Sequence, residues 1–234
     1  MKKLIPMLLL WSSALAALAQ GVVVVPNGFG NVEGNSSTSD PFTSSSFRFQ
    51  QVFSASQFGT TPFFINNIRF RMDGASSGDV LYSFGGGTVQ FSTTTRTADN
   101  LSSVFADNIG SDVTTVRNGA FSFGGTFQPG ASPQPFGQTI SVSPFLYNPA
   151  QGNLLLDIRG RSGLVLFPGA LDAESTVGDS VSWVFASSEL PTFGNVSTLG
   201  LITRFDVALV PEPSTWMITT MGLSILLALK RRRS

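Results

Sequence analysis

Residues 63–72 read FFINNIRFRM, and they carry the strongest signal for a β-sheet fold in this 234-residue chain. In the second half of the run, the apolar Ile68 and Phe70 alternate with the charged Arg69 and Arg71. Successive side chains of a strand point to opposite faces. The alternation therefore predicts a strand that buries Ile68 and Phe70 and turns its two arginines to the polar face.

Outward from this run, short apolar stretches alternate with turns rich in Gly, Ser, Thr, Asn and Pro. The 21 Phe residues favour strands, as aromatic residues generally do. We expect Phe205 to be buried as well, because its neighbours in the predicted strand are polar, and Leu155, because it lies in the apolar-rich strand predicted at residues 153–159. The break Gly85-Gly86-Gly87 indicates a hairpin or a bulged pair. Further strands are predicted at residues 22–25, 47–53, 80–84, 88–92, 113–117, 120–123, 140–142, 153–159, 164–167, 181–186 and 199–209.

One short helix is expected within this pattern. Apolar residues recur at helical spacing from Leu101 to Phe105, Asp99 or Asn100 can cap the first turn, and Gly110 can end the helix. About 190 residues remain between the two ends of the chain, and β-sandwiches of this size commonly stay undivided. The sequence therefore predicts a single all-β domain, a β-sandwich with one short helix.

The N-terminus has the parts of a secretory signal peptide. Two lysines precede a short apolar run, and Ala17 and Ala19 form an A-x-A cleavage pattern before Gln20. A resident membrane helix is the alternative, but the run is short and its small-residue end fits cleavage better. We expect signal peptidase to remove residues 1–19.

The C-terminus, residues 210–234, has three parts in a fixed order. They are Val210-Pro211-Glu212-Pro213, an apolar run from Trp216 to Leu229, and the basic cluster Lys230-Arg231-Arg232-Arg233. As a helix the run spans roughly 21 Å, short of the ~30 Å hydrocarbon core, but Trp216 and the four cations at the two interfaces extend its reach. A buried core helix is the alternative, and four adjacent cations without an acidic partner disfavour it. A transmembrane helix at residues 216–229 is therefore predicted.

This order of parts resembles the PEP-CTERM sorting signal of bacterial envelope proteins, also catalogued as the ice-binding protein C-terminal motif. The resemblance covers about a tenth of the chain. It implies that the tail is held in the inner membrane and that an exosortase, a transpeptidase within the membrane, recognises Pro211, Glu212 and Pro213. It implies where the protein goes and not what residues 20–209 do.

The exported domain, residues 20–209, is also similar to uncharacterised exported proteins that carry this tail. The similarity implies a jelly-roll-like β-sandwich and carries no activity with it. It rests on four segments, residues 49–53, 65–71, 101–110 and 145–158.

Composition excludes several classes of function for this domain. Six of the 14 cationic residues of the chain lie in the two end segments, which leaves eight Arg against 13 acidic residues, or a net charge of about −5. Nucleic-acid binding rests on clustered cations, so we expect no nucleic-acid partner. The chain has no Cys and no His, which excludes disulfides, Cys nucleophiles, His-dependent triads and zinc sites built on these residues.

A loose calcium-loop pattern is one candidate site. Asp107, Asn108 and Asp112 offer oxygen ligands around Gly110. The regular spacing and the late bidentate Glu of an EF-hand are missing. The alternative is a helix-ending turn whose Asp and Asn side chains satisfy backbone groups. We favour the turn, and we expect no metal and no other cofactor.

Acidic residues provide a second candidate, a glycosidase-like carboxylate pair. Asp157, Asp172, Glu174 and Asp179 could contribute to it, but such a pair needs two carboxylates at a set separation across a cleft. The sequence does not place these acids across one. We expect solvated, ionised loop charges instead.

Two further features allow a functional and a structural interpretation. Residues 92–97, STTTRT, are similar to the Thr-bearing faces of ice-binding proteins, but a single row makes no flat array and Thr is common in strands. Trp183 could stack on a sugar, although aromatic residues on such strands belong more often to the core. We favour the structural interpretation of both.

The expected function follows from these elements. The chain is predicted to be an exported protein of the bacterial cell envelope or extracellular matrix, tethered to the inner membrane and then displayed or released after processing. A structural or adhesive role is favoured over catalysis. A carbohydrate-binding module for exopolysaccharide is the alternative, and a carboxylate hydrolase is a third hypothesis. The expected partners are signal peptidase, an exosortase-type enzyme and the inner membrane.

Overall fold

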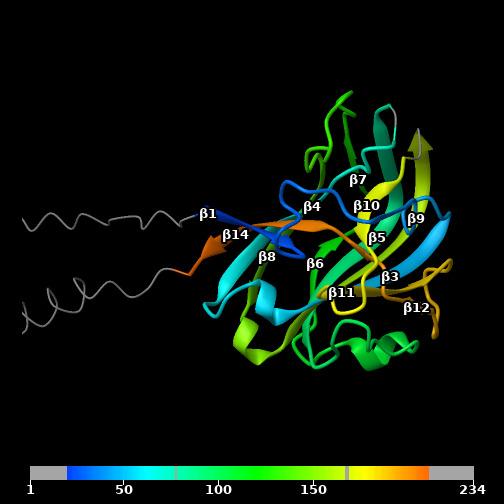
Figure 1. Cartoon of the computed structure of the whole chain (residues 1–234). Coiled ribbons are helices and arrows are strands. Elements are labelled where there is room, and N and C mark those ends of the chain that lie inside the picture. Colours follow the sequence, from blue (N-terminus) through cyan, green and yellow to red (C-terminus); the bar gives the residue numbers. More distant parts are fainter. Residues whose placement is uncertain (1–19, 77, 167–168, 211–234) are drawn as a thin grey trace, which may run out of the picture. The chain divides into compact units, whose positions relative to one another are not determined.

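Strands dominate the computed structural model, which describes residues 20–210 except 77 and 167–168 (Figure 1). The strands are β1 (Gln20–Val25), β2 (Ser36–Thr38), β3 (Ser46–Phe53), β4 (Phe63–Phe70), β5 (Val80–Thr94), β6 (Thr114–Asn118), β7 (Phe121–Gly125), β8 (Gln138–Tyr147), β9 (Asn153–Leu166), β10 (Leu171–Glu174), β11 (Val181–Ala186), β12 (Asn195–Ser197), β13 (Gly200–Leu201) and β14 (Thr203–Leu209). Short 3-10 helices form at η1 (Ala55–Gln57), η2 (Phe105–Asn108) and η3 (Pro149–Gln151). The all-β prediction is confirmed.

The described strands form three sheets in which neighbours are antiparallel. Their orders are β1-β14-β4-β8, β13-β10-β2 and β12-β11-β3-β9-β5-β6, with β7 beside β5 in the last. Rings from the four-stranded and seven-stranded sheets meet between them. Phe205 of β14 packs edge-on against Phe53 of β3 at 5.0 Å, and Phe145 of β8 stacks on Phe91 of β5 at 5.3 Å. The main hydrophobic core therefore lies between these two sheets.

The four residues predicted to be buried are all buried, but they belong to two different hydrophobic clusters. Ile68, Phe70 and Phe205 lie in the main core. Leu155 of β9 points to the opposite face of the seven-stranded sheet, where it joins a smaller apolar cluster with Phe105 of η2. The segment that contains η2 thus covers part of the outer face of this sheet.

The helix predicted between Leu101 and Gly110 is limited to the four-residue η2, which has no side-chain cap. The side chain of Asn108 explains the difference. Its Oδ1 accepts from the backbone N–H of Ser102 and its Nδ2 donates to the carbonyl oxygen of Ser102, so it competes with helical hydrogen bonds. Asp99, a predicted cap, has a left-handed backbone with φ of 61°.

Two pairs of predicted strands are continuous in the structure. β5 passes through residues 85–87 instead of turning back, so the hairpin alternative is wrong, whereas the pairing of β5 with β9 has the register shifts of a bulged pair between Ser83 and Gly86. At these glycines β5 exchanges one neighbour, β7, for another, β6, while β9 stays on its other side. A Cβ atom on Gly87 would lie 2.5 Å from the carbonyl oxygen of Arg159, so this approach requires glycine. β9 likewise joins the strands predicted at residues 153–159 and 164–167.

Phe42 is the centre of the aromatic core, although it lies in a Ser- and Thr-rich loop between β2 and β3. Its side chain is fully buried. Six rings surround it at centroid distances of 4.9 to 6.5 Å, and they belong to Phe47, Phe49, Phe70, Tyr82, Phe84 and Phe123. These rings come from β3, β4, β5 and β7, so one loop residue joins four strands.

Replacing Phe42 with Ala should lower the free energy of unfolding by about 3–5 kcal/mol, because the change removes a buried ring and leaves a cavity. Phe193→Ala is the matched control. It removes a ring that is 64% exposed, so its effect should stay within about 0.5 kcal/mol. Denaturant unfolding of both variants, followed by circular dichroism, makes the comparison. Equal effects would contradict the central position of Phe42.

Candidate functional site

Most of the predicted sorting residues lie outside the part of the chain that the structure describes. Gln20 is the exception, since it begins β1 and is exposed. Over the described residues, no helix combines the length and the apolar character that a membrane crossing requires. The predictions that fall outside are those for Ala17, Ala19, Pro211, Glu212, Pro213, Trp216, Leu229, Lys230, Arg231, Arg232 and Arg233.

The two ends of the described domain lie side by side. β1 and β14 are antiparallel neighbours, and Gln20 pairs with Ala208 (Figure 1). Leu209 and Val210, which precede the predicted sorting motif, are 45% and 36% exposed. The chain therefore enters and leaves the domain at the same place, where the start of β1 pairs with the end of β14.

The candidate calcium ligands all have protein partners of their own. Asn108 is buried, and besides Ser102 it donates to Oε1 of Gln50 at 3.0 Å. Asp107 accepts from the hydroxyl of Ser102, and Asp112 accepts from a backbone N–H of β5 at 2.7 Å. These contacts are those of a structural turn that is attached to the sheet beneath it.

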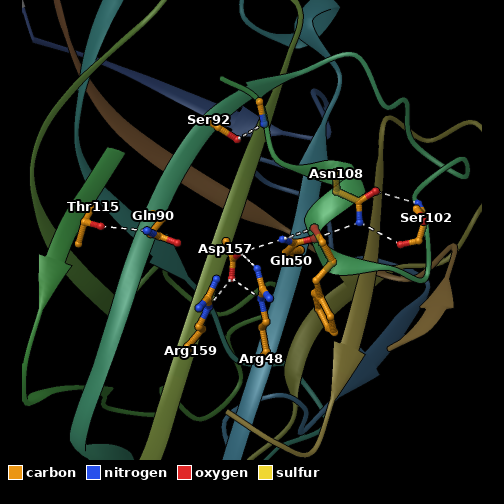
Figure 2. Close-up of polar contacts among 11 residues, drawn as sticks. Arg48, Gln50, Gln90, Ser92, Ser102, Asn108, Thr115, Asp157 and Arg159 are labelled. Carbon is orange, nitrogen blue, oxygen red and sulfur yellow. Dashed lines mark hydrogen bonds and ion pairs between the residues drawn. The ribbon is translucent and has the colours of Figure 1, made fainter. Parts of the chain in front are cut away.

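Figure 2 shows the polar cluster beneath this turn, on the outer face of the seven-stranded sheet. Nε and Nη2 of Arg48 donate to the two carboxylate oxygens of Asp157, at 3.2 and 2.6 Å. Gln50 donates to Oδ2 of Asp157 at 2.7 Å. Nε of Arg159 lies 3.7 Å from Oδ1. One carboxylate on β9 thus faces two guanidinium groups, that of Arg48 from the neighbouring β3 and that of Arg159 from β9 itself.

This cluster anchors the η2 segment to the sheet. Gln50 also donates to the carbonyl oxygen of Phe105 at 3.2 Å, and the guanidinium of Arg48 lies 4.6 Å from the centroid of the Phe105 ring. Arg48 and Asp157 are almost wholly buried, so each charge is compensated by the other rather than by water. The pair has a structural role in this position.

The prediction that the candidate acids are solvated loop charges is wrong for three of the four. Asp157, Asp172 and Glu174 are at most 4% exposed, and the latter two lie on β10, a short strand that the sequence pattern did not reveal.

Arg71 lies beyond the end of β4, buried beside Asp172 and not on a polar strand face as predicted. Burial raises the pKa of Asp172 above its usual 3.8. This effect outweighs the charge and the hydrogen bond of Arg71, both of which lower the pKa. Asp179 is half-buried, and burial raises its pKa as well.

Asp172 also belongs to an acidic cluster with Glu33 and Asp73, in which one carboxylate oxygen of each lies within 4.8 Å of the others. Protein donors already engage all three, since Oδ1 of Asp73 accepts from the backbone N–H of Ala75 at 2.9 Å. Arg71 donates to Asp172 at 2.6 Å, and Glu33 accepts from the backbone N–H of Gly74. These oxygens stabilise the loops around β10, and the cluster has the contacts of a structural element.

Trp183 is a core residue, as favoured from the sequence. It is 7% exposed and packs edge-on against Phe49 at 5.4 Å. In the run of residues 92–97, Ser92 and Thr94 are buried. The run therefore presents no continuous threonine face.

A polar groove of about 340 Å³ lies over β1, β14 and β4. We call it the outer groove, because it lies on the face of the four-stranded sheet that points away from the core. Arg69 and Arg204 are paired across β4 and β14, and both donate to Asp206 through their Nε atoms, at 2.7 and 3.0 Å. Its lining is formed by Gln20, Gly21, Val22, Asn66, Asn67, Arg69, Arg204, Asp206 and Val207.

The carboxylate of Asp206 stays ionised in this arrangement. Its burial by itself raises the pKa, but hydrogen bonds and charges from Arg69 and Arg204 outweigh burial and lower the pKa below 3.8. A carboxylate with a lowered pKa is a poor acid or base near neutral pH. Asp206 is therefore unsuited to proton transfer near neutral pH.

Sequence reasoning identified only part of this groove. The alternation in residues 63–72 placed Arg69 on the polar face of its strand, and the same alternation in β14 is the signal that could have placed Arg204 and Asp206 together. The pairing of Arg204 with Arg69 across two strands is a matter of register, which the sequence does not display. The groove therefore emerges only from the sheet.

Comparison with known proteins does not identify the chain. Searches against protein-family models, curated proteins and solved structures find no match.

Replacing Asp157 with Asn should lower the free energy of unfolding by about 3–5 kcal/mol, because it leaves the buried Arg48 without its counter-charge. Glu189→Gln is the matched control. Glu189 pairs with Arg161 at 2.7 Å, but the Arg161 side chain is 71% exposed, so the loss should be at most about 1 kcal/mol. Denaturant unfolding measures both changes. A neutral effect of Asp157→Asn would show that the buried pair has no structural role.

Proposed function

We propose that this chain is an exported protein of the bacterial cell envelope or extracellular matrix, sorted through its C-terminal tail, with a structural or adhesive role. The proposal includes a jelly-roll-like sandwich for residues 20–209, a signal peptide at residues 1–19 and a membrane helix at residues 216–229. It rests first on the tail, whose order of Pro-Glu-Pro, apolar run and basic cluster resembles the PEP-CTERM signal.

The observation that supports this most directly is the pairing of β1 with β14. Both predicted processing points adjoin these strands, one before Gln20 and the other after Val210. Leu209 and Val210 are exposed, so an enzyme could reach the chain that follows them without opening the core. Processing at either end would leave the sandwich intact.

We also propose that the domain is not an enzyme. The buried acids that could supply carboxylate chemistry have structural partners: Arg48 and Gln50 for Asp157, and Arg71 for Asp172. Glu174 accepts from the backbone N–H of Asn35 at 3.1 Å.

Carbohydrate binding is the second candidate function, and the outer groove favours it. Its guanidinium and amide groups, from Arg69, Arg204, Asn66 and Asn67, are the kinds of side chain that hydrogen-bond hydroxyl and carboxylate groups.

Replacing Pro211, Glu212 and Pro213 together with Ala should block maturation and leave the full-length chain in the inner membrane. The expected result follows from loss of the recognised motif, and immunoblots of membrane and released fractions from a host with an exosortase would measure it. Ser214→Ala is the control and should mature normally. If the triple variant matures like the wild type, the sorting proposal is wrong.

The full chain should show no turnover on a panel of polysaccharides and peptides, because its buried acids are engaged by protein groups. Release of reducing ends or free amines is the measurement. Turnover that disappears in a Glu174→Gln variant that still folds would overturn the proposal and favour the hydrolase hypothesis.

A further inference from the structure

The outer groove differs in charge from the domain that carries it. Residues 20–209 have a net charge of about −5, whereas the groove contains two arginines and one acid. Arg69 and Arg204 remain 30% and 34% exposed after pairing with Asp206, which is 19% exposed. The groove therefore has one unit of positive charge accessible to solvent.

The hydrogen-bonding capacity of the two arginines is only partly used. Arg69 donates to Asp206 and, through Nη1, to the hydroxyl of Thr139 at 2.8 Å. Within the described residues, Arg204 donates to Asp206 alone. A guanidinium carries five N–H donors. Several donors of this pair are thus available to a ligand in the groove.

A β-bulge adds amide groups to the same groove. Ile65 pairs with Val207 and Asn67 pairs with Asp206, so Asn66 is an extra residue without a partner on β14. Bulges commonly change the direction of side chains next to active sites. In a regular strand, adjacent residues such as Asn66 and Asn67 point to opposite faces. At this bulge both of them line the groove.

Aromatic residues are missing from the lining, whose apolar side chains are Val22 and Val207. Binding in this groove would then depend on charge-assisted hydrogen bonds and not on stacking. An isolated carboxylate fits the single positive charge, because it accepts bidentate hydrogen bonds from guanidinium groups. Side-chain amides, which both donate and accept, fit neighbouring hydroxyl groups.

We propose that the outer groove binds an acidic polysaccharide through the carboxylate of a uronate unit. Arg204 and Arg69 hold the carboxylate, while Asn66 and Asn67 hold hydroxyl groups of the same or the next sugar. The proposal deepens the carbohydrate-binding candidate and rests on it. It does not depend on the sorting tail.

The test is calorimetric titration of the full chain in detergent with a defined oligogalacturonate. We expect binding that weakens as NaCl is raised, because its main contacts are charged. Arg204→Gln should weaken binding about 10-fold by removing a charge-assisted contact. Asn66→Asp, which adds a negative charge without touching the Arg69–Asp206 contact, should weaken it by about as much. Thermal unfolding of each variant checks that it is folded.

Arg161→Gln is the matched control, since it removes one exposed positive charge from the other large sheet. It should leave the affinity within about two-fold of the wild type. Equal weakening by Arg161→Gln and Arg204→Gln would show that net charge alone attracts the ligand, and would overturn the proposal.

Three further ligands separate the alternatives. The fully methyl-esterified oligogalacturonate should bind much more weakly, and equal binding would overturn the acidic specificity while keeping the carbohydrate candidate. Poly-glutamate or inorganic phosphate that binds as tightly as oligogalacturonate would replace the sugar with a peptide or a simple anion. Lack of binding to both forms of the oligosaccharide would overturn the proposal together with the carbohydrate candidate.

Discussion

Close packing of aromatic rings between two facing sheets is the interaction on which the rest of this domain depends. The chain has no cysteine, so the core has to hold the domain without disulfide links. Phe42 lies at the centre of the rings and is supplied by a loop rather than by a strand. Edge-on contacts such as that of Phe53 with Phe205 add a geometric preference to the burial of apolar area. The sheets are thereby held in one relative position, and their outer faces become stable surfaces.

Buried charge is the second constraint, and arginine satisfies it. The domain has no lysine and no histidine, so arginine is the cation that compensates its buried acids. Arg48 with Asp157 anchors the η2 segment, and Arg71 with Asp172 joins the end of β4 to β10. A buried charge is costly unless it is paired, so these pairs fix which segments meet. The acids that seemed available for chemistry are instead part of the scaffold.

The four-stranded sheet combines two features with functional consequences. Its strands β1 and β14 bring the two ends of the described domain together, and the same strands with β4 form the outer groove. Gln20, next to the predicted cleavage point, is itself a lining residue of that groove. Under the proposed function, the binding surface and the processed ends therefore share one sheet, and the seven-stranded sheet has mainly a structural role.

The sequence by itself determined the all-β class and those core residues that lie in regular strands. Ile68, Phe70 and Phe205 could be found because alternation with polar neighbours is a local property of the chain. The tertiary structure alone decided the burial of Phe42, Arg71 and Asp157, since these depend on partners far along the chain. It also decided that β5 continues through its glycines, because β9 supplies the ladder there. The outer groove has the same origin: Arg69, Arg204 and Asp206 are brought together by strand register, and register is set by the whole sheet.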